Sequence, residues 1–296
     1  MENDKFKFYR DIRLWPLAEE FNYENWIANF AKGEEQEIAR RILDFFIYIP
    51  DGQINQMLSS VIGKCGCYFK QERGCWSDDD FKNNCWYSFI PGEELSPTDS
   101  GFIFNRKLRD VIHIPENRIK NYEILQSKLA RERNQNVILV DDFVGSGHQT
   151  YVAWTRDDND SGKSLMETTI ENDHRIIYAP LIVNQMGCDL IKTKCAALGL
   201  TYIHLIDKHY SLFDKDCPCW NGDENLYKRA VELIESKSKT LGIPSTKGGH
   251  VIDVKGYREQ GLAIAFEHCI PDACPPIFYW ETDEWKPLMK KVYPRS

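Results

Sequence analysis

The feature that most constrains this sequence is a short apolar run that leads into two acids and a glycine-rich turn. Residues 136–141 read Asn-Val-Ile-Leu-Val-Asp, and a second acid, Asp142, precedes Phe-Val-Gly-Ser-Gly. An apolar, β-branched run of this length is typical of a central parallel strand, which is covered on both faces. The pattern therefore predicts a buried strand that runs into a loop at the carboxyl edge of a sheet.

Other apolar runs predict further strands of the same sheet. They lie at residues 85–90, 175–183, 201–206 and 262–266. Helical periodicity predicts the connections between them, at residues 102–111, 122–133, 186–198 and 224–236, with Gly199 as the cap of the third. Strands that alternate with helices imply a mainly parallel sheet, so we expect an α/β fold.

The first sixty residues have a different pattern, because helical spacing dominates them. Apolar residues recur from Tyr23 to Ile47 with a break at Lys32-Gly33, and another helix is expected from Ile54 to Gly63. We therefore predict an N-terminal helical subdomain, residues 1–64, and an α/β core with a C-terminal extension, residues 65–296. The helical segment contains no catalytic spacing, so we assign it a packing role.

Composition limits the class of protein. The chain has 296 residues, 42% hydrophobic content and a formal net charge of -8. It can bury a sizeable core, and its acidic balance does not favour direct nucleic-acid binding. No run approaches the roughly 20 apolar residues of a membrane helix, and the first residues lack the apolar core of a signal peptide. We expect a soluble cytoplasmic protein that does not associate with membranes.

The ten cysteines raise the question of a metal site. Four of them cluster as Cys65, Cys67, Cys75 and Cys85. Zinc ligands usually come in pairs separated by two residues, and this cluster has irregular distances instead. The spacing disfavours zinc at these four positions and favours reduced, mostly buried thiols.

The glycine-rich turn has the chemistry of a sugar-phosphate site. Gly145 and Gly147 permit close backbone approach, so that successive N–H groups can face a phosphate, and Ser146 adds a hydroxyl donor. Asp141 and Asp142 can accept hydrogen bonds from ribose hydroxyls or help to hold Mg²⁺. The alternative is an ordinary strand end with a capped turn. Two adjacent carboxylates repel each other, which favours a ligand role.

At these residues the sequence resembles the PRPP loop of the type I phosphoribosyltransferases. The acids match Asp141 and Asp142, the variable segment matches residues 143–145, and the Thr/Ser-Gly step matches residues 146–147. Gln149 departs from the pattern, since Thr or Ser is usual there and Thr150 follows one residue later. The resemblance implies a parallel sheet of this type and a 5′-phosphate held by Gly145, Ser146, Gly147, His148, Gln149 and Thr150.

Over most of the chain, the sequence resembles the phosphoribosyltransferase-like domain that accompanies bacterial conflict and anti-phage systems. The matching segments are residues 26–48, Ser100-Gly101, residues 141–147, 266–271 and 275–280, and the ending with residues 285–288 and 294–295. This resemblance implies a defence effector with a protein partner in the same system. It also implies that Ser100 and Gly101 belong to a pyrophosphate-side loop, although a simple helix N-cap is an equal alternative.

Glu267 and His268 follow directly on the strand candidate 262–266. We expect them at the end of a sheet, where α/β folds place their ligands, so both are catalytic candidates. A histidine can act as general acid or base, and a neighbouring carboxylate can orient it. The alternative is a histidine–backbone hydrogen bond that closes the loop before Pro271.

The functional hypothesis is transfer or cleavage at the anomeric carbon of PRPP or a ribonucleotide, dependent on Mg²⁺ held by Asp141 and Asp142. One alternative is a catalytically silent module that senses a nucleotide and regulates a partner. Another is a toxin-like effector controlled by a reverse transcriptase or another nucleic-acid partner, which rests on the family resemblance alone.

Overall fold

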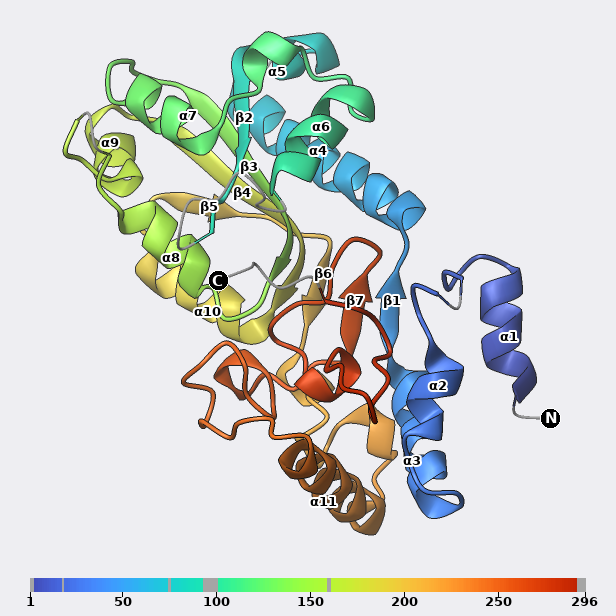
Figure 1. The fold of residues 1–296 in the computed structure, drawn as a ribbon. Coiled ribbons are helices and arrows are strands. Elements are labelled where there is room, and N and C mark those ends of the chain that lie inside the picture. Colours follow the sequence, from blue (N-terminus) through green and yellow to red (C-terminus); the bar gives the residue numbers. More distant parts are fainter. Residues whose placement is uncertain (1–2, 18, 74–75, 93–100, 159–160, 292–296) are drawn as a thin grey trace. The chain divides into compact units, whose positions relative to one another are not determined.

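The computed structural model describes residues 3–17, 19–73, 76–92, 101–158 and 161–291 (Figure 1). The chain forms two compact units. One unit combines residues 1–51 with residues 207–296, and the other is the continuous segment 52–206.

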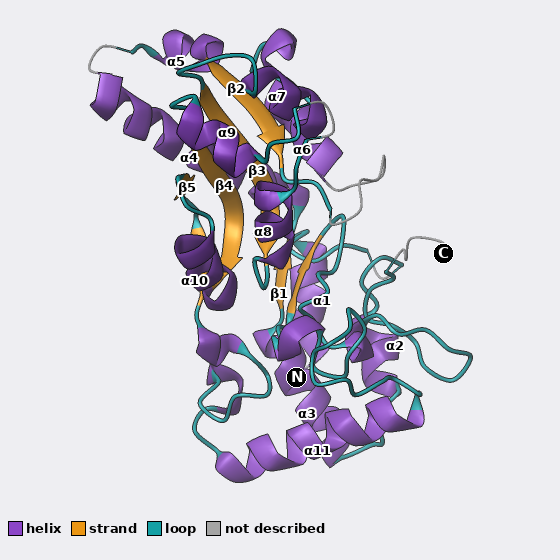
Figure 2. Ribbon diagram, turned by 90° about the vertical axis from the view of Figure 1, so that its left-hand side faces the viewer, coloured by secondary structure: helices purple, strands orange, loops and turns teal. Residues whose placement is uncertain are grey.

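The continuous unit is built on a parallel sheet (Figure 2). Its strands are β2 (Cys85–Phe89), β3 (Asn136–Val144), β4 (Arg175–Asn184), β5 (Leu198–Leu200) and β6 (His204–Ile206). The order is β2-β3-β4-β5, with β6 paired to the far end of β4, and every pairing is parallel. The predicted α/β fold with a mainly parallel sheet is confirmed.

Helices cover both faces of this sheet. They are α4 (Asp51–Arg73), α5 (Asp78–Asn84), α6 (Gly101–Asp110), the 3-10 turn η1 (Glu116–Arg118), α7 (Tyr122–Leu129), α8 (His148–Thr155), α9 (Leu165–Glu171) and α10 (Gln185–Lys194). Buried residues of α7 to α10 form one apolar cluster with β3 and β4. α6 packs against β2 and β3, and its Lys107 donates to Asn55 of α4 at 2.8 Å. Within the described ranges, no helix is long and apolar enough to cross a lipid bilayer.

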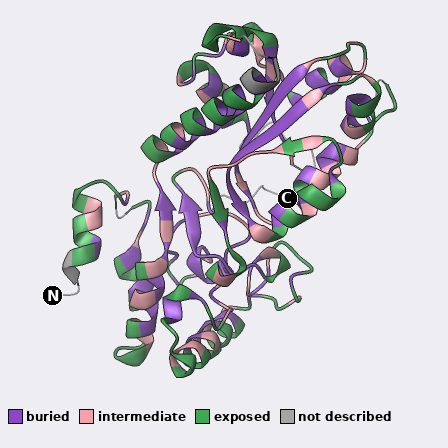
Figure 3. Cartoon of the chain, turned by 180° about the vertical axis from the view of Figure 1, so that it is seen from behind, coloured by how far each residue is buried: buried purple, intermediate pink, exposed green. Residues whose placement is uncertain are grey.

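The centre of β3 shows why its apolar run predicts a buried strand. Residues 137–140, Val-Ile-Leu-Val, are all fully buried, as the burial colours of the long strands show (Figure 3). Consecutive strand residues point to opposite faces, so full burial of all four requires cover on both sides. Each such side chain contributes about 1.5–3 kcal/mol on burial, which anchors the strand that carries Asp141 and Asp142.

The other unit combines the two ends of the chain. Its elements are α1 (Asn3–Asp11), α2 (Tyr23–Ala28), α3 (Glu34–Phe45), β1 (Ile47–Ile49), η2 (Lys208–Tyr210), η3 (Pro218–Trp220), α11 (Glu224–Thr240), η4 (Tyr257–Glu259), β7 (Ile264–Phe266) and η5 (Pro276–Phe278). Strands β1 and β7 pair in parallel, with Ile47 opposite Ile264 and Ile49 opposite Phe266.

Aromatic residues join the N-terminal helices to the C-terminal segment inside this unit. The indole N–H groups of Trp26 and Trp285 both donate to the carbonyl of Ile277, at 2.9 and 3.2 Å. The ring of Trp26 also stacks on Phe278 at 5.5 Å between centroids. The shared acceptor ties the two ends of the chain into one core.

Four local expectations were wrong. The strand expected at 262–266 forms only at Ile264–Phe266 and pairs with β1 instead of joining the five-stranded sheet. Gly63 does not end a helix, because α4 continues to Arg73 and a glycine inside a long helix costs only about 1 kcal/mol. Gly199 lies within β5 and is not a helix cap. The strand expected at 201–206 forms only at His204–Ile206. The predicted domain boundary after residue 64 stays a prediction, although α4 runs through that position.

Candidate functional site

The glycine loop, residues 145–147, connects β3 to α8 as the sequence predicted. β3 ends at Val144, and α8 begins at His148 with Gly147 as its N-cap. Gly147 has a φ of 75°, in the left-handed region that side chains with a Cβ rarely adopt. The amide groups at the start of α8 therefore follow a turn that requires glycine, which is a suitable arrangement for an anion.

A glycine of α10 that the sequence analysis missed packs directly against this loop. A Cβ added to Gly187 of α10 would lie 2.5 Å from the carbonyl oxygen of Gly145 and 2.7 Å from a methyl group of Val144. A Cβ added to Gly147 would lie 3.0 Å from the carbonyl oxygen of Gly187. The two backbones are therefore in direct contact. The available signal was a glycine only three residues after the end of a buried strand.

Asp141 is buried and has a protein donor at each carboxyl oxygen. The hydroxyl of Tyr178 donates to its Oδ2 at 2.8 Å, and the backbone N–H of Asp142 donates to its Oδ1 at 3.0 Å. Burial raises the pKa of Asp141 well above its usual value, and the charge of neighbouring Asp142 raises it further.

Asp142 is buried beside it, and its Oδ1 accepts the N–H of Phe143 at 2.8 Å. The side chain of Asp142 lies beside that of Asp141 and raises the pKa of Asp141, because two neighbouring carboxylates disfavour each other's ionisation. We call these two residues the acid pair. A cation or ribose hydroxyls beside the acid pair would offset the cost of ionising both groups.

Thr150, a predicted phosphate contact, lies inside the protein. Its side chain is almost fully buried and lies beside the hydroxyl of Tyr178, where it opposes the rise that burial causes in the pKa of that phenol. Tyr178 therefore lies between Thr150 and Asp141. The sequence analysis missed Tyr178 because a single tyrosine in an apolar strand is usually a residue of the hydrophobic core.

The remaining loop residues have distinct contacts. The Ser146 hydroxyl accepts the N–H of His148 at 3.3 Å. The side-chain amide of Gln149 donates to the carbonyls of Ile90 and Pro91, at 3.4 and 3.1 Å. The residue that departs from the family pattern thus ties the start of α8 to the end of β2. The predicted ligand roles of Ser146, His148 and Gln149 stay predictions.

Of the proposed pyrophosphate-side pair, Ser100 lies outside the described residues. Gly101 is the first residue of α6 and is buried. A Cβ there would lie 1.9 Å from the ring of Phe89, so close packing against β2 is enough to require glycine. Its ligand role stays a prediction.

Glu267 and His268 belong to the unit formed by the chain ends. The Glu267 carboxylate accepts the N–H of Asp51 at 2.7 Å, and the Glu267 N–H donates to the carbonyl of Ile49 at 3.0 Å. Both bonds lie within the unit that the chain ends form. The His268 ring lies 5.7 Å from that of Phe266. The catalytic roles predicted for Glu267 and His268 stay predictions.

The cysteine cluster divides by environment. Cys65 and Cys85 are buried, and burial raises the pKa of Cys65, so its thiol is held in the neutral form. Cys67 is exposed on α4, and Cys75 lies outside the described residues. The interpretation as reduced thiols stays a prediction.

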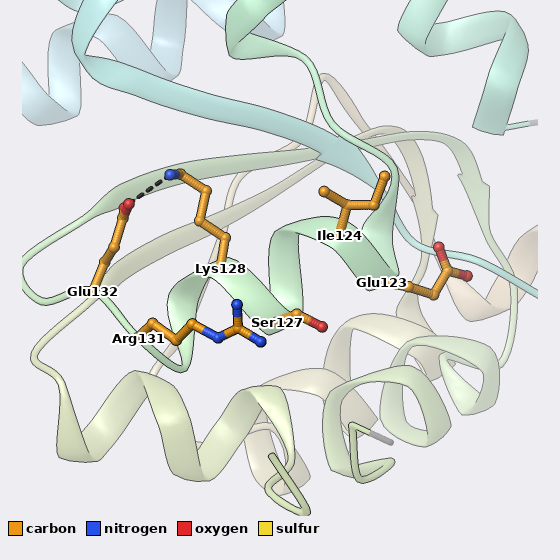
Figure 4. Close-up of a pocket in the computed structure, with 6 residues that line it drawn as sticks. All are labelled: Glu123, Ile124, Ser127, Lys128, Arg131 and Glu132. Atoms are coloured by element: carbon orange, nitrogen blue, oxygen red, sulfur yellow. Dashed lines mark hydrogen bonds and ion pairs between the residues drawn. The ribbon is translucent and has the colours of Figure 1, made fainter. Parts of the chain in front are cut away.

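A surface depression of about 560 Å³ lies over α7 (Figure 4). Its lining residues are Glu123, Ile124, Ser127, Lys128, Arg131 and Glu132. Lys128 and Glu132 form an ion pair at 2.5 Å. Two cations balance two carboxylates here, so the lining has no excess positive charge for a phosphate.

Comparison with known protein families shows which family the chain belongs to. The sequence matches the PRTase-CE family over residues 23–291, nearly the whole chain. The chain belongs to the PRTase-CE family. This is a family of phosphoribosyltransferase-like domains, so the predicted resemblance is confirmed. No curated protein matches the chain in sequence.

Proposed function

We propose that the PRTase-CE chain binds PRPP or a ribose-phosphate nucleotide at the glycine loop and the acid pair, and acts at the anomeric carbon. The observation that carries this proposal is the buried acid pair at the carboxyl end of β3, directly before a loop that requires glycine. Ligands of open α/β sheets bind at the carboxyl ends of the strands.

The loop provides for the 5′-phosphate. The N–H groups around residues 145–148 and the Ser146 hydroxyl would donate to its oxygens, and the positive end of α8 favours the negative charge. Because Thr150 is buried beside Tyr178, the phosphate would be held by backbone donors more than by side chains.

The acid pair provides for the ribose. Its carboxylate oxygens would accept hydrogen bonds from the ribose hydroxyls while positive charge develops at the anomeric carbon. The bond to pyrophosphate or base breaks at that carbon, and an acceptor or water forms the new bond. Glu267 and His268 remain candidates for moving a proton in that step.

The acid pair also fits Mg²⁺, because both members offer the carboxylate oxygens that this ion prefers, and a divalent charge would offset their repulsion. Both oxygens of Asp141 accept protein donors, and Asp142 would add a second carboxylate to the ligands of the ion. When bound, Mg²⁺ supplies positive charge that stabilises a departing pyrophosphate.

Calorimetry tests this function. PRPP and common ribonucleotides are titrated into the purified chain with and without Mg²⁺, and the mixtures are analysed for released pyrophosphate or base. Asp142→Asn should abolish Mg²⁺-linked binding, whereas Asp79→Asn, an exposed acid in the first turn of α5, should leave it unchanged. If none of these ligands binds the unaltered chain, the proposal is wrong.

A second candidate is a silent sensor of the same ligands. The hydrogen bonds of Gln149 to protein carbonyls and the burial of Thr150 favour it, because side-chain donors to the phosphate are fewer than in the type I enzymes that the loop resembles. Regulators can keep a ligand site while losing turnover. Binding without any product in the same calorimetry samples would support the sensor.

We further propose that the site serves a bacterial anti-phage defence system, in the cytoplasm and with a protein partner from that system. The support is the family resemblance over most of the chain. Cells that carry the whole system should lose protection against phage when the chain carries Asp142→Asn and keep it with Asp79→Asn. Co-purification of the other proteins of the system would identify the partner, and nuclease treatment would reveal a nucleic-acid component.

A further inference from the structure

The hydroxyl of Tyr178 lies between the two ends of the segment that forms the proposed phosphate site. We propose that Tyr178 is a positioning residue that, together with the Thr150 hydroxyl, holds both ends of the glycine loop in the ligand-binding geometry. This inference rests on the proposed function and assigns Thr150 to Tyr178 instead of to the phosphate.

The connection runs through three separate elements. Asp141 precedes the glycine loop on β3, Thr150 follows it in the first turn of α8, and Tyr178 lies on the neighbouring strand β4. The Tyr178 hydroxyl donates to Asp141 at 2.8 Å and lies beside the Thr150 side chain. One side chain therefore bridges the start and end of a ten-residue segment, 141–150.

The register of the sheet explains why Tyr178 reaches Asp141. Tyr178 pairs with Leu139, and Pro180 pairs with Asp141. Residues two positions apart on a strand share a face and lie about 7 Å from each other, so a tyrosine that leans forward places its hydroxyl at the carboxyl group.

The bridge also determines the position of Asp142. Asp141 accepts the Asp142 N–H with one oxygen and the Tyr178 hydroxyl with the other. Movement of the Asp141 carboxyl would therefore shift the backbone that carries Asp142, the residue assigned to the ribose and to Mg²⁺. From Thr150 the same bridge restrains the first turn of α8, whose N–H groups face the proposed phosphate.

A purely structural role would not require these polar groups. An apolar pair of similar shape is often as stable as a buried polar pair, and Phe in place of Tyr178 would fill the same space. The benefit of the hydroxyl is a loop held in one geometry before the ligand arrives, which lowers the entropic cost of binding.

The test compares two tyrosines of the same unit. Tyr178→Phe removes the bridging hydroxyl, and Tyr122→Phe removes an equally buried hydroxyl that donates to the Ala153 carbonyl at 2.6 Å, at the other end of α8. Affinity for PRPP with Mg²⁺ and for ribose 5-phosphate is measured by calorimetry, with Tm recorded for each variant. Tyr178→Phe should weaken binding about tenfold or more, whereas Tyr122→Phe should lower Tm and leave the affinity within roughly twofold.

A double-mutant cycle tests the role given to Thr150. Thr150→Val should weaken binding, Thr150→Ser should restore it, and Thr150→Val combined with Tyr178→Phe should be no weaker than Tyr178→Phe alone. Additive losses would mean that Thr150 contacts the ligand directly, and would overturn its assignment to Tyr178.

The outcomes separate this inference from the function on which it rests. If the unaltered chain binds neither ligand, the proposed function and the inference both fail. If it binds and Asp142→Asn abolishes binding while Tyr178→Phe binds normally, the function stands and the positioning role is wrong. Equal affinity losses in Tyr178→Phe and Tyr122→Phe would also overturn it, because they would indicate a general effect of lost stability.

Discussion

Polar side chains are buried at both the amino ends and the carboxyl ends of β3 and β4. The amino ends bury a neutral histidine, whereas the carboxyl ends bury two neighbouring carboxyl groups. At the amino ends, His174 accepts the N–H of Gln135 through Nδ1 at 3.1 Å and bonds the carbonyl of Leu129 through Nε2 at 2.9 Å. Burial lowers the pKa of His174, so the ring is neutral. At the carboxyl ends, the acid pair holds two carboxyl groups against each other and burial raises the pKa of Asp141.

The comparison distinguishes a hydrogen-bond network that stabilises the fold from a pair of acids whose burial costs free energy. The His174 ring uses both nitrogens and carries no charge, so its burial is compensated within the fold. The acid pair gains hydrogen bonds but loses solvation and suffers repulsion when both members ionise. Polar groups that are poorly compensated by the protein itself are typical of sites that await a ligand.

The largest expected effect comes from Gly187→Ala at the carboxyl end. The new methyl group would meet the Gly145 carbonyl oxygen at 2.5 Å, so the loop or α10 must move. We expect a loss of about 2–3 kcal/mol in the free energy of unfolding and at least about a hundredfold loss of PRPP affinity, because both backbones are tightly packed. Urea denaturation and calorimetry measure the two quantities.

Gly63→Ala is the matched control for that variant. Gly63 lies inside α4, and a Cβ there meets nothing within 4 Å. It should stabilise the chain by about 0.5–1 kcal/mol with unchanged PRPP affinity. Unchanged affinity in Gly187→Ala would show that the glycine loop does not hold the ligand.

At the amino end, His174→Ala should cost about 2–3 kcal/mol of unfolding free energy. It leaves the Gln135 N–H and the Leu129 carbonyl without their ring partner and creates a cavity. PRPP affinity at 25 °C should not change. His174→Asn, whose side-chain oxygen can still accept the Gln135 N–H, should lose less. If either variant is folded but loses PRPP affinity, the amino ends of β3 and β4 also contribute to ligand binding, and the two ends of the strands do not differ in role.

Asp142→Asn should increase the free energy of unfolding, and by less than His174→Ala decreases it. It removes one member of the acid pair while its side-chain oxygen can still accept the Phe143 N–H. We expect the free energy of unfolding to rise by about 1 kcal/mol at pH 8 without ligand, since repulsion in the pair is gone. Urea denaturation measures this. A less stable Asp142→Asn would show that the acid pair is a structural element and not a strained site.

Much of the fold could be predicted because the pattern was strong where burial is complete. The run 136–141 and the run 175–183 have apolar residues at nearly every position, and only a strand covered on both faces explains that. The boundaries failed where local signals compete with packing. Gly63 looked like a helix end, yet the tertiary contacts of α4 outweigh one poor helix former.

The site could be predicted only in part. Adjacent acids followed by glycines are visible along the chain, so the acid pair and Gly147 could be found. Tyr178 and Gly187 are distant in sequence, and the parallel pairing of β3 with β4 and the packing of α10 bring them to the loop. Without that pairing, a tyrosine and a glycine carry no functional signal.

The smallest expected effect is the pH dependence of stability at the amino end. The folded pKa of His174 is below the usual value of about 6.5 because burial outweighs the opposing charges of Glu132 and Asp173. Below that usual value the unfolded chain binds more protons than the folded chain. The stabilising contribution is therefore complete above pH 6.5 and is lost as the pH falls toward the folded pKa.

Urea denaturation between pH 5 and pH 8 measures this loss, and comparison with His174→Asn isolates it from the other histidines. The unaltered chain should lose more stability on acidification than the variant, which has no titrating group at this position. Parallel curves for the two proteins would mean that His174 titrates equally in both states. The amino end would then no longer be the compensated neutral network against which the acid pair is compared.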